Sequence, residues 1–387
     1  MAAVHTQVAV IGGGVVGCAV AHALARRDVG CTVIEAEPGL ALGASGTNSG
    51  ILHTGFDSTP GELETQLILR SAALREELLD ELGIESWRCG ALLRPSDEEE
   101  SAAVERLAAN ARANGVEAHL GGDGVLSVPG ETVSDPVEFV HALAGAARGG
   151  GATVRLGAHV VGLAGESVGG IAIELADGER VHADAAVNCA GLYADEVARM
   201  AGEEPVGVYP RKGEFLVFEL PEGELLEQIL LPVPSSMGKG VLVFPTLDRR
   251  HAITGPTARE RVDKRDWSVE RDAEELLLAK ATRMYPPLAR AARVGAYAGL
   301  RPAGRDGANY VIERSRTLSG LVHVAAIRST GLSASLGIGE HVVGMLADAG
   351  AIEPGPVRAL PAPAEQPPSS ARWWERSVKH RQLPEAR

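Results

Sequence analysis

Four residues near the start of the chain are spaced to bind a dinucleotide. Gly12, Gly14 and Gly17 follow an apolar run, and Glu35 ends a second apolar run 18 residues after Gly17. In a βαβ unit the first glycine permits a tight turn, the second lets the backbone approach a pyrophosphate, and the third lets helix and strand pack closely. The helix N-terminus offers N–H groups to the anion, and a carboxylate such as Glu35 suits a ribose with a free 2′-hydroxyl. The alternative is a chance glycine turn, which the complete strand, helix, strand and acid pattern disfavours.

A polar, glycine-rich segment follows. Residues 43–57, GASGTNSGILHTGFD, are too polar for a core helix, so we expect a loop whose backbone surrounds a large ligand. The segment resembles the flavin-contacting loop of the D-amino-acid-oxidase-like superfamily of FAD-dependent oxidoreductases. Its NSGxxHxGFD pattern is most similar to that of the glycerol-3-phosphate oxidases and dehydrogenases, and next to that of the L-2-hydroxyglutarate oxidases. The resemblance covers residues 8–349 and implies FAD as the cofactor.

His53 is the catalytic base that this resemblance implies. A flavin enzyme that oxidises an alcohol or an amine needs a base for the substrate proton, and histidine titrates near neutral pH. Glycerol-3-phosphate oxidases have a histidine three residues after the glycine of this loop, and Gly50 and His53 reproduce that spacing. The alternative is a histidine that only hydrogen-bonds to the backbone of its own loop.

The resemblance also implies the residues that bind FAD. Ser49 and Asn48 can bond to the flavin or its ribityl chain, although a loop that caps itself internally explains them equally well. The helix expected to begin at Thr330 would direct its N–H groups at the flavin pyrimidine and stabilise the reduced anion. The expected cofactor-binding residues are Gly12, Gly14, Val15, Val16, Gly17, Glu35, Ala36, Ser45, Thr47, Asn48, Ser49, Gly50, Val160, Ala190, Gly191, Arg301, Thr330, Gly331, Leu332 and Ser333.

Arg301 is expected to hold the substrate anion and is counted among the catalytic residues. It lies in a GLRP sequence directly after a predicted strand, and the resemblance places its guanidinium over the flavin. A surface arginine paired with Asp306 is the alternative. The predicted substrate site consists of Ser49, His53, Lys212, Arg301, Arg328 and Thr330.

Two lysines complete the expected site. Lys212 stands where the related PxRGEY segment usually has arginine, so the charge is kept but the bidentate geometry is lost. Lys264 is included among the catalytic residues as an oxygen-activating or proton-relaying cation near flavin N5. The charged residues around it favour the other interpretation, a solvated lysine in a charged turn.

The composition excludes several classes of partner. The 387 residues are 45% apolar, enough for two sizeable cores, and the net charge of −14 argues against nucleic acid. No apolar run approaches the ~20 residues that cross a bilayer, and the first residues lack the features of a signal peptide. The four cysteines show no metal-ligand or CxxC spacing, which indicates reduced thiols and no metal site. We expect a cytoplasmic protein, with membrane association left open.

The order of the predicted elements gives the fold class. Helices are predicted at 62–82, 98–114, 136–148, 267–285 and 331–347, a strand at 87–94, and a three-stranded antiparallel meander at 153–183. We expect an α/β fold with two domains. A Rossmann-like FAD-binding domain with a crossover meander takes residues 1–84, 135–205 and 300–350, and an α+β substrate domain with a mixed sheet takes 85–134 and 206–299.

Residues 351–387 form a predicted tail that is rich in proline and then basic. The tail either lies over the surface or docks a partner through an exposed pair of tryptophans, Trp373 and Trp374.

The expected reaction is oxidation of the secondary alcohol of a small anionic substrate, with hydride transfer to flavin N5. The first candidate is sn-glycerol 3-phosphate, which gives dihydroxyacetone phosphate. One alternative is oxidation of L-2-hydroxyglutarate or another 2-hydroxy acid. Another is amine oxidation like that of glycine oxidase, because these enzymes share the fold and differ in the residues of the substrate site. A flavin-binding partner protein without catalysis is the alternative of another class, and His53 with Arg301 argues against it. Dioxygen, a quinone and a redox protein all stay open as electron acceptors, and the oligomeric state is not predicted.

Overall fold

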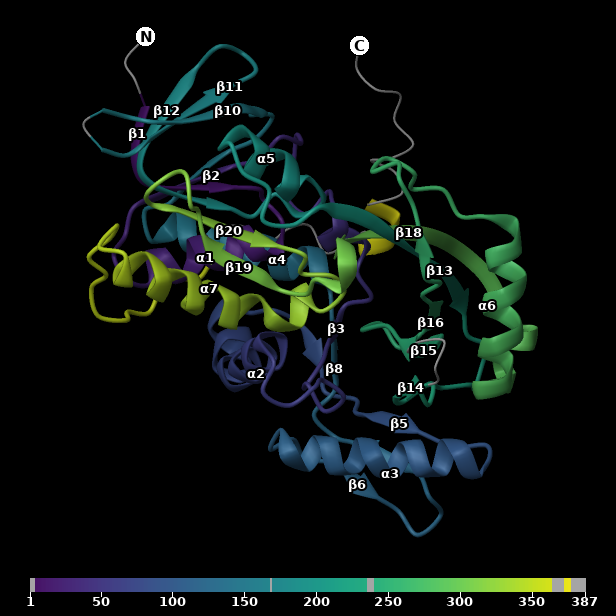
Figure 1. The fold of residues 1–387 in the computed structure, drawn as a ribbon. Coiled ribbons are helices and arrows are strands. Elements are labelled where there is room, and N and C mark those ends of the chain that lie inside the picture. The colour runs from purple at the N-terminus through teal and green to yellow at the C-terminus, as the bar shows by residue number, and fades with distance from the viewer. Residues whose placement is uncertain (1–3, 168, 235–239, 364–371, 377–387) are drawn as a thin grey trace.

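The glycine fingerprint lies at the centre of a parallel sheet. The computed structural model describes residues 4–167, 169–234, 240–363 and 372–376. Five parallel strands run in the order β9-β2-β1-β12-β20, and the antiparallel strand β19 lies at the edge beside β20. Their bounds are β1 (Val4–Ile11), β2 (Cys31–Ile34), β9 (Thr153–Arg155), β12 (Arg180–Asn188), β19 (Val311–Arg314) and β20 (Leu321–Ala325). The Rossmann-like α/β architecture expected from the sequence is confirmed (Figure 1).

Helices cover one face of this sheet, and a small antiparallel layer covers the other. Val8 and Val10 of β1 pack with the helix side, whereas Ala9 and Ile11 pack with the meander side, as period-two alternation requires. Helix α1 (Val15–Ala25) contacts both α4 (Pro136–Gly149) and α7 (Gly331–Asp348), and α2 (Leu63–Leu82) packs on α7. On the opposite face lie β10 (Val160–Gly165), β11 (Ile171–Leu175) and α5 (Ala194–Met200).

The predicted meander is correct in part. Strands β10, β11 and β12 pair in antiparallel order, and β12 continues without a break into the buried strand beside β1. The first predicted strand is different, because β9 pairs in parallel with β2 and belongs to the nucleotide sheet. Alternation of apolar and polar residues indicates a strand but not its partner, so the sequence pattern could not separate β9 from the meander.

The second sheet is mixed, as predicted, and supports the roof of the site. Seven of its nine strands run in the order β13-β16-β15-β14-β5-β7-β6, and β14 pairs in parallel with β5. Strand β18 pairs along one edge of β13, while β17 and β16 share the opposite edge. Helix α6 (Arg271–Met284) packs on it, and α3 (Glu98–Ala113) lies near β6 (Figure 1). The strands are β5 (Ala91–Leu93), β6 (His119–Leu120), β7 (Leu126–Val128), β13 (Val208–Glu219), β14 (Ile229–Leu231), β15 (Leu242–Pro245), β16 (His251–Gly255), β17 (Arg259–Glu260) and β18 (Ala292–Gly304).

A third, small sheet joins the two larger parts. It contains β3 (Ile51–Leu52), β8 (Thr132–Ser134) and β4 (Ser86–Trp87). The single strand predicted at 87–94 is therefore wrong, because the chain leaves β4 and enters β5 of a different sheet. Gly90 makes this change with a φ of +72°.

The predicted helix ends follow known capping chemistry. Helix α2 ends at Gly83, which has a φ of +64°, and Asp135 caps α4 by accepting hydrogen bonds from the N–H groups of Val137 and Glu138. None of the helices in the described ranges is long and apolar enough to cross a bilayer.

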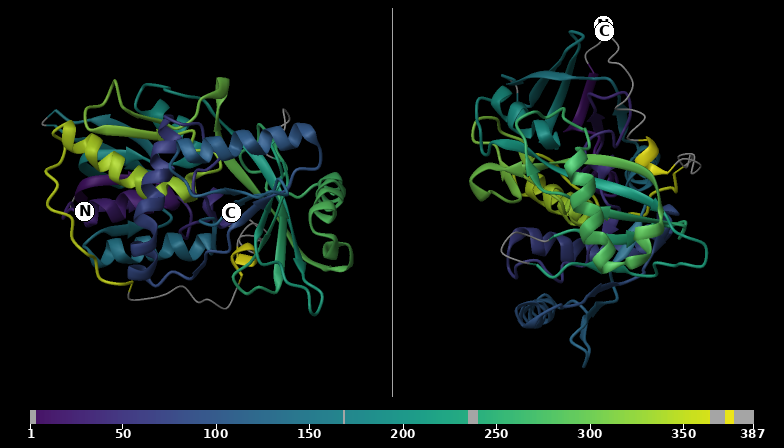
Figure 2. Two further views of the ribbon diagram at one scale, coloured as in Figure 1. Left: turned by 90° about the horizontal axis from the view of Figure 1, so that it is seen from below. Right: turned by 90° about the vertical axis from the view of Figure 1, so that its right-hand side faces the viewer.

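The chain after α7 runs over the helix side of the nucleotide domain (Figure 2). The N–H of Gly355 donates to the carbonyl of Arg27 at 2.7 Å, and that of Arg358 donates to Arg26 at 2.9 Å. Residues 372–376 then form a short helical turn in which Trp373 and Trp374 are only 4% and 3% exposed. The alternative of a docking segment with an exposed tryptophan pair is thus wrong. The last basic residues, 377–387, lie outside the described residues.

Candidate active site

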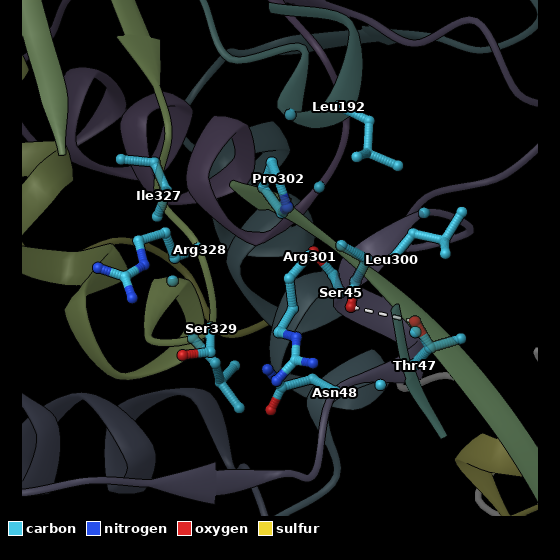
Figure 3. Close-up of a pocket in the computed structure, with 18 of the residues that line it drawn as sticks. Ser45, Thr47, Asn48, Leu192, Leu300, Arg301, Pro302, Ile327, Arg328 and Ser329 are labelled. Atoms are coloured by element: carbon cyan, nitrogen blue, oxygen red, sulfur yellow. Dashed lines mark hydrogen bonds between the residues drawn. The ribbon is translucent and has the colours of Figure 1, made fainter. Parts of the chain in front are cut away.

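One cavity of about 1330 Å³ connects the glycine fingerprint with the second sheet. It is lined at one end by residues at the carboxyl ends of β1 and β2, in the middle by the loop of residues 43–57, and at the other end by β13, β15 and β18. Ligands of open α/β sheets bind at the carboxyl ends of the strands, so this is the expected place for a dinucleotide. Figure 3 shows Ser45, Thr47 and Asn48 of the loop on one side and Ile327, Arg328 and Ser329 on the other.

The fingerprint end fits a dinucleotide for steric reasons. Gly12 has a φ of +113°, and a Cβ at this position would lie 2.4 Å from the carbonyl oxygen of Cys189. A Cβ on Gly17 would lie 1.9 Å from the carbonyl oxygen of Gly12, so only glycine permits this approach of helix and strand. Gly14 itself has no side chain to cap α1, and the N–H of Val15 donates to the hydroxyl of Ser45 at 2.9 Å. The next N–H groups, those of Val16 and Gly17, have no acceptor among the described residues and are available to an anion.

Glu35 lines the same end of the cavity. Its Oε2 accepts a hydrogen bond from the N–H of Gly13 at 2.5 Å, and its Oε1 accepts one from the N–H of Glu37 at 2.8 Å. Burial raises the pKa of Glu35, while these N–H groups act in the opposite direction. The carboxylate is therefore held at the end of β2, where an adenosine ribose would lie.

Most residues expected to bind FAD line this cavity. Three do not: Gly17 packs against Gly12, Gly50 lies against the carbonyl of Ser134, and Ser333 bonds to the loop backbone. The expected residues in the lining are Gly12, Gly14, Val15, Val16, Glu35, Ala36, Ser45, Thr47, Asn48, Ser49, Val160, Ala190, Gly191, Arg301, Thr330, Gly331 and Leu332.

His53 lies in the lining, and strand register gives it a buried partner. Leu52 of β3 pairs with Thr132 of β8, so His53 and Glu131 form the next opposite pair of this antiparallel ladder. The Nδ1 of His53 lies 2.7 Å from Oε2 of Glu131, a carboxylate that is fully buried. The other oxygen of Glu131 accepts hydrogen bonds from the N–H and the hydroxyl of Thr54 at 2.7 and 2.8 Å.

This contact fixes which nitrogen of His53 is free. A carboxylate can only accept hydrogen bonds, so Nδ1 donates and the lone pair of a neutral imidazole lies on Nε2. Within the described ranges Nε2 has no hydrogen-bond partner, and the side chain is 26% exposed. The arrangement can accept a proton at Nε2 while Glu131 stabilises the resulting cation.

The backbone at His53 is held from two further elements. Its N–H donates to the hydroxyl of Ser333 on α7 at 2.8 Å, and its carbonyl accepts from Nη2 of Arg75 on α2 at 2.7 Å. Nη1 of Arg75 donates to the carbonyl of Leu52 at 2.8 Å, and burial lowers the pKa of Arg75 to about 10. Ser333 thus positions His53, which differs from its expected contact with the cofactor.

Two arginines lie opposite each other above the cavity. Arg211 of β13 pairs with Arg301 of β18, and both residues line the cavity. Nε of Arg301 donates to the carbonyl of Arg211, and its Nη2 donates to the carbonyls of Lys212 and Thr257, at 2.7–3.0 Å. Burial, followed by the charges of Arg211 and Arg328, lowers the pKa of Arg301 to about 10. Like charges directly opposite on a sheet are destabilising, and a bound anion would relieve that repulsion.

Arg211, unlike Arg301, has a buried nitrogen, Nε, without a hydrogen-bond partner among the described residues. Buried donors are normally paired, so this nitrogen is a candidate contact for a ligand oxygen. Figure 3 shows Arg301 directed toward the loop of Thr47 and Asn48, and the exposed Arg328 directed away from it.

Lys212 does not reach the cavity, which corrects its expected contact with the substrate. Successive side chains of a strand point to opposite faces, so the residue after Arg211 faces away from the cavity. The Lys212 ammonium is buried and bonds to Asp266 at 2.9 Å and to Ser268 at 3.0 Å.

Lys264 likewise lies outside the lining. Its ammonium bonds to Asp195 at 2.9 Å and Glu196 at 2.7 Å, over the ring of Tyr193. These contacts satisfy its charge and argue against the expected catalytic role.

Glu131 and Arg211 were not among the site residues predicted from the sequence. Glu131 follows a Pro-Gly turn 78 residues after His53, and only the pairing of two very short strands brings them together. Arg211 could have been found, because the resemblance to PxRGEY identified the segment and strand alternation decides which of two adjacent cations faces the site.

Comparisons with known proteins agree with this geometry. The sequence model of the family described as FAD dependent oxidoreductase (DAO) matches residues 7–345. A glycerol 3-phosphate dehydrogenase from Caloramator mitchellensis is 30% identical over 356 residues, 88% of this chain and 73% of that protein. An L-2-hydroxyglutarate dehydrogenase from Escherichia coli O17:K52:H18 is 29% identical over 69% of this chain and 68% of its own length.

A solved structure with FAD bound has a similar fold. The L-α-glycerophosphate oxidase from Mycoplasma pneumoniae, solved with FAD bound, aligns with a TM-score of 0.82 and 25% identity, covering 94% of this chain and 97% of that one. The family match covers most of the chain, and the glycine cradle, Glu35 and the cavity fit the cofactor. The chain therefore belongs to the DAO family of FAD-dependent oxidoreductases, and it is an enzyme that uses FAD.

Proposed function

We propose that the protein oxidises the secondary alcohol of a small anionic substrate, with sn-glycerol 3-phosphate as the first candidate and dihydroxyacetone phosphate as the product. The observation that carries the proposal is the cross-strand pair Arg211 and Arg301 above the cavity that His53 faces. Two guanidinium groups suit a phosphate, because Nη1 of Arg301 and Nε of Arg211 have no acceptor among the described residues and can donate to different phosphate oxygens.

The residues of the site divide the reaction between them. FAD, when bound, accepts a hydride at N5 of its flavin. His53 takes the hydroxyl proton on Nε2 as the C–H bond breaks, so that the carbon and oxygen form a carbonyl. Glu131 keeps Nδ1 protonated and stabilises the imidazolium. The arginines hold the substrate anion, and this orients the carbinol carbon toward the cofactor.

The N-terminus of α7 has a supporting role in this proposal. Thr330, Gly331 and Leu332 line the cavity at the first turn of the helix, where N–H groups and the helix dipole favour negative charge. These groups would stabilise negative charge on the ring of a flavin bound there. The Thr330 hydroxyl is fixed by Glu64 at 2.6 Å and by Tyr310 at 2.9 Å.

L-2-Hydroxyglutarate is the second candidate, since a carboxylate also suits two arginines and a relative of 29% identity is an L-2-hydroxyglutarate dehydrogenase. Anaerobic mixing of the purified holoenzyme with each compound, followed by absorbance at the flavin band, separates the candidates. We expect glycerol 3-phosphate to bleach the flavin fastest, L-2-hydroxyglutarate to be slower, and glycerol to be poor because it lacks the anion. Fastest reduction by glycine or sarcosine would instead identify an amine oxidase, and no reduction by any of these compounds would contradict the proposal.

A further inference from the structure

A short segment after the nucleotide domain contacts the cofactor loop. Residues 372–376 form a helical turn that lies between this loop and the second sheet, close to β18 (Figure 1). The rings of Trp373 and Trp374 are nearly perpendicular, with centroids 4.6 Å apart, and Trp374 also packs against His251 at 5.9 Å. Arg376 anchors the turn to the nucleotide domain through Asp135, at 2.5 Å.

The contact with the loop is a hydrogen bond to one carbonyl. Nε1 of Trp373 donates to the carbonyl oxygen of Asn48 at 3.3 Å, and the hydroxyl of Tyr297 donates to the same oxygen at 3.4 Å. Both donors are buried, and burial raises the pKa of Tyr297, so its hydroxyl keeps its proton. Two donors from outside the loop thus fix the direction of the Asn48 carbonyl.

That direction determines where the next amide points. In a planar trans peptide the N–H of residue 49 points opposite to the C=O of residue 48. The Asn48 carbonyl points to Trp373, so the Ser49 N–H points to the other side of the peptide plane, and Asn48 and Ser49 both line the cavity.

The Ser49 amide is also the one without a partner in its stretch of loop. The N–H groups of Asn48, Gly50 and Ile51 donate to Ser45, Asn48 and Ser49 respectively, all within the loop. For the N–H of Ser49 the described residues supply no acceptor. A backbone donor beside a cavity and without a protein acceptor is available to a ligand.

We propose that Trp373 is a positioning residue for FAD: its indole N–H holds the Asn48–Ser49 peptide so that the Ser49 N–H is presented to the cofactor. The inference rests on the proposed flavin site, and it assigns a role to a segment beyond residue 345, where the family match ends. By linkage, bound FAD should also stabilise the 372–376 turn against opening.

The test is Trp373→Phe, which keeps an aromatic ring and removes only the N–H donor. Trp374→Phe is the matched control, because its ring packs on His251 and Gly295 of the second sheet. FAD affinity is measured by titrating apoprotein and following flavin fluorescence, and the visible flavin spectrum and apoprotein melting temperature are recorded. We expect Trp373→Phe to weaken FAD binding by about 3- to 10-fold, as for one lost hydrogen bond, and to shift the flavin bands. Trp374→Phe should stay within about two-fold of the parent.

The second measurement is hydrogen exchange at residues 372–376, with and without FAD. FAD should slow exchange there in the parent and less in Trp373→Phe. Equal FAD affinity of Trp373→Phe and the parent, or an equal loss in both variants, would overturn the inference while leaving the proposed function in place. A parent that binds no FAD would overturn the proposed function first and this inference with it.

Discussion

At the scale of single residues, the proposed role of His53 as a base requires contacts that orient its ring and backbone. Its ring, N–H and carbonyl are bound by Glu131, Ser333 and Arg75, which lie in the turn before β8, in α7 and in α2. The histidine itself could be predicted from the loop sequence, because the NSGxxH spacing is local. Its partners could not, since each contact depends on tertiary packing between segments far apart in the chain.

We predict that Glu131→Gln inactivates the base while the fold survives. The amide oxygen can still accept from Thr54, which leaves the NH₂ group facing Nδ1 of His53 and favours the tautomer with its proton on Nε2. Flavin reduction by substrate should fall about 10²- to 10⁴-fold, with KM and FAD content nearly unchanged. Stopped-flow reduction measures this, and Glu138→Gln on α4 is the control. A rate within a few-fold of the parent would show that another group takes the proton.

At the scale of secondary structure, alternation along β13 decides the roles of two adjacent cations. Helices with clear start and end residues, such as α2 and α4, could be predicted closely, because their capping groups lie within the same segment. Strand partners were harder to predict, as β4, β5 and β9 show, because pairing depends on segments elsewhere in the chain. Lys212 rather than Arg211 was the expected substrate contact for a different reason: the expectation followed the PxRGEY resemblance and not the alternation along β13, which is local.

This register gives a paired prediction. Arg211→Met should raise KM for the anionic substrate about 10- to 100-fold, the equivalent of roughly 1.5–3 kcal/mol, because a charged hydrogen-bond donor is lost. Its melting temperature should change little. Lys212→Met should instead destabilise the protein by about 1–3 kcal/mol, since Asp266 and Ser268 lose their hydrogen bonds to a buried ammonium while Asp266 keeps Arg261. Steady-state kinetics measure the effect of each variant on KM, and thermal melts measure its effect on stability. Equal effects of the two substitutions on KM would contradict the assignment of their faces.

At the scale of the whole molecule, α1 is the element on which the other parts of the nucleotide domain depend. It begins at the glycine turn, packs on α4 and α7, and lies against the sheet. The chain after α7 also returns to this helix, where Gly355 bonds to Arg27. The composition and the fingerprint predicted this α/β core, but the return of the tail depends on contacts that no local pattern encodes. A group that titrates within α1 should therefore affect the stability of the entire domain.

His22 is that group, and it predicts how stability depends on pH. Its side chain is 4% exposed, and burial, followed by the charge of Arg26, lowers the pKa of His22 from 6.5 to about 4. Above pH 6.5 the residue is neutral in both the folded and unfolded states and does not affect stability. As the pH falls from 6.5 to 4, only the unfolded state takes up the proton, so stability is lost, by about 2 kcal/mol at pH 5. For a chain of this size that loss lowers the melting temperature of the apoprotein by about 3 °C.

His22→Gln should remove these roughly 3 °C from the difference in melting temperature between pH 7.5 and pH 5, whereas the same substitution at the exposed His5 should leave the difference unchanged. An unchanged acid-induced shift in His22→Gln would mean that the acid sensitivity of the domain arises from groups outside α1.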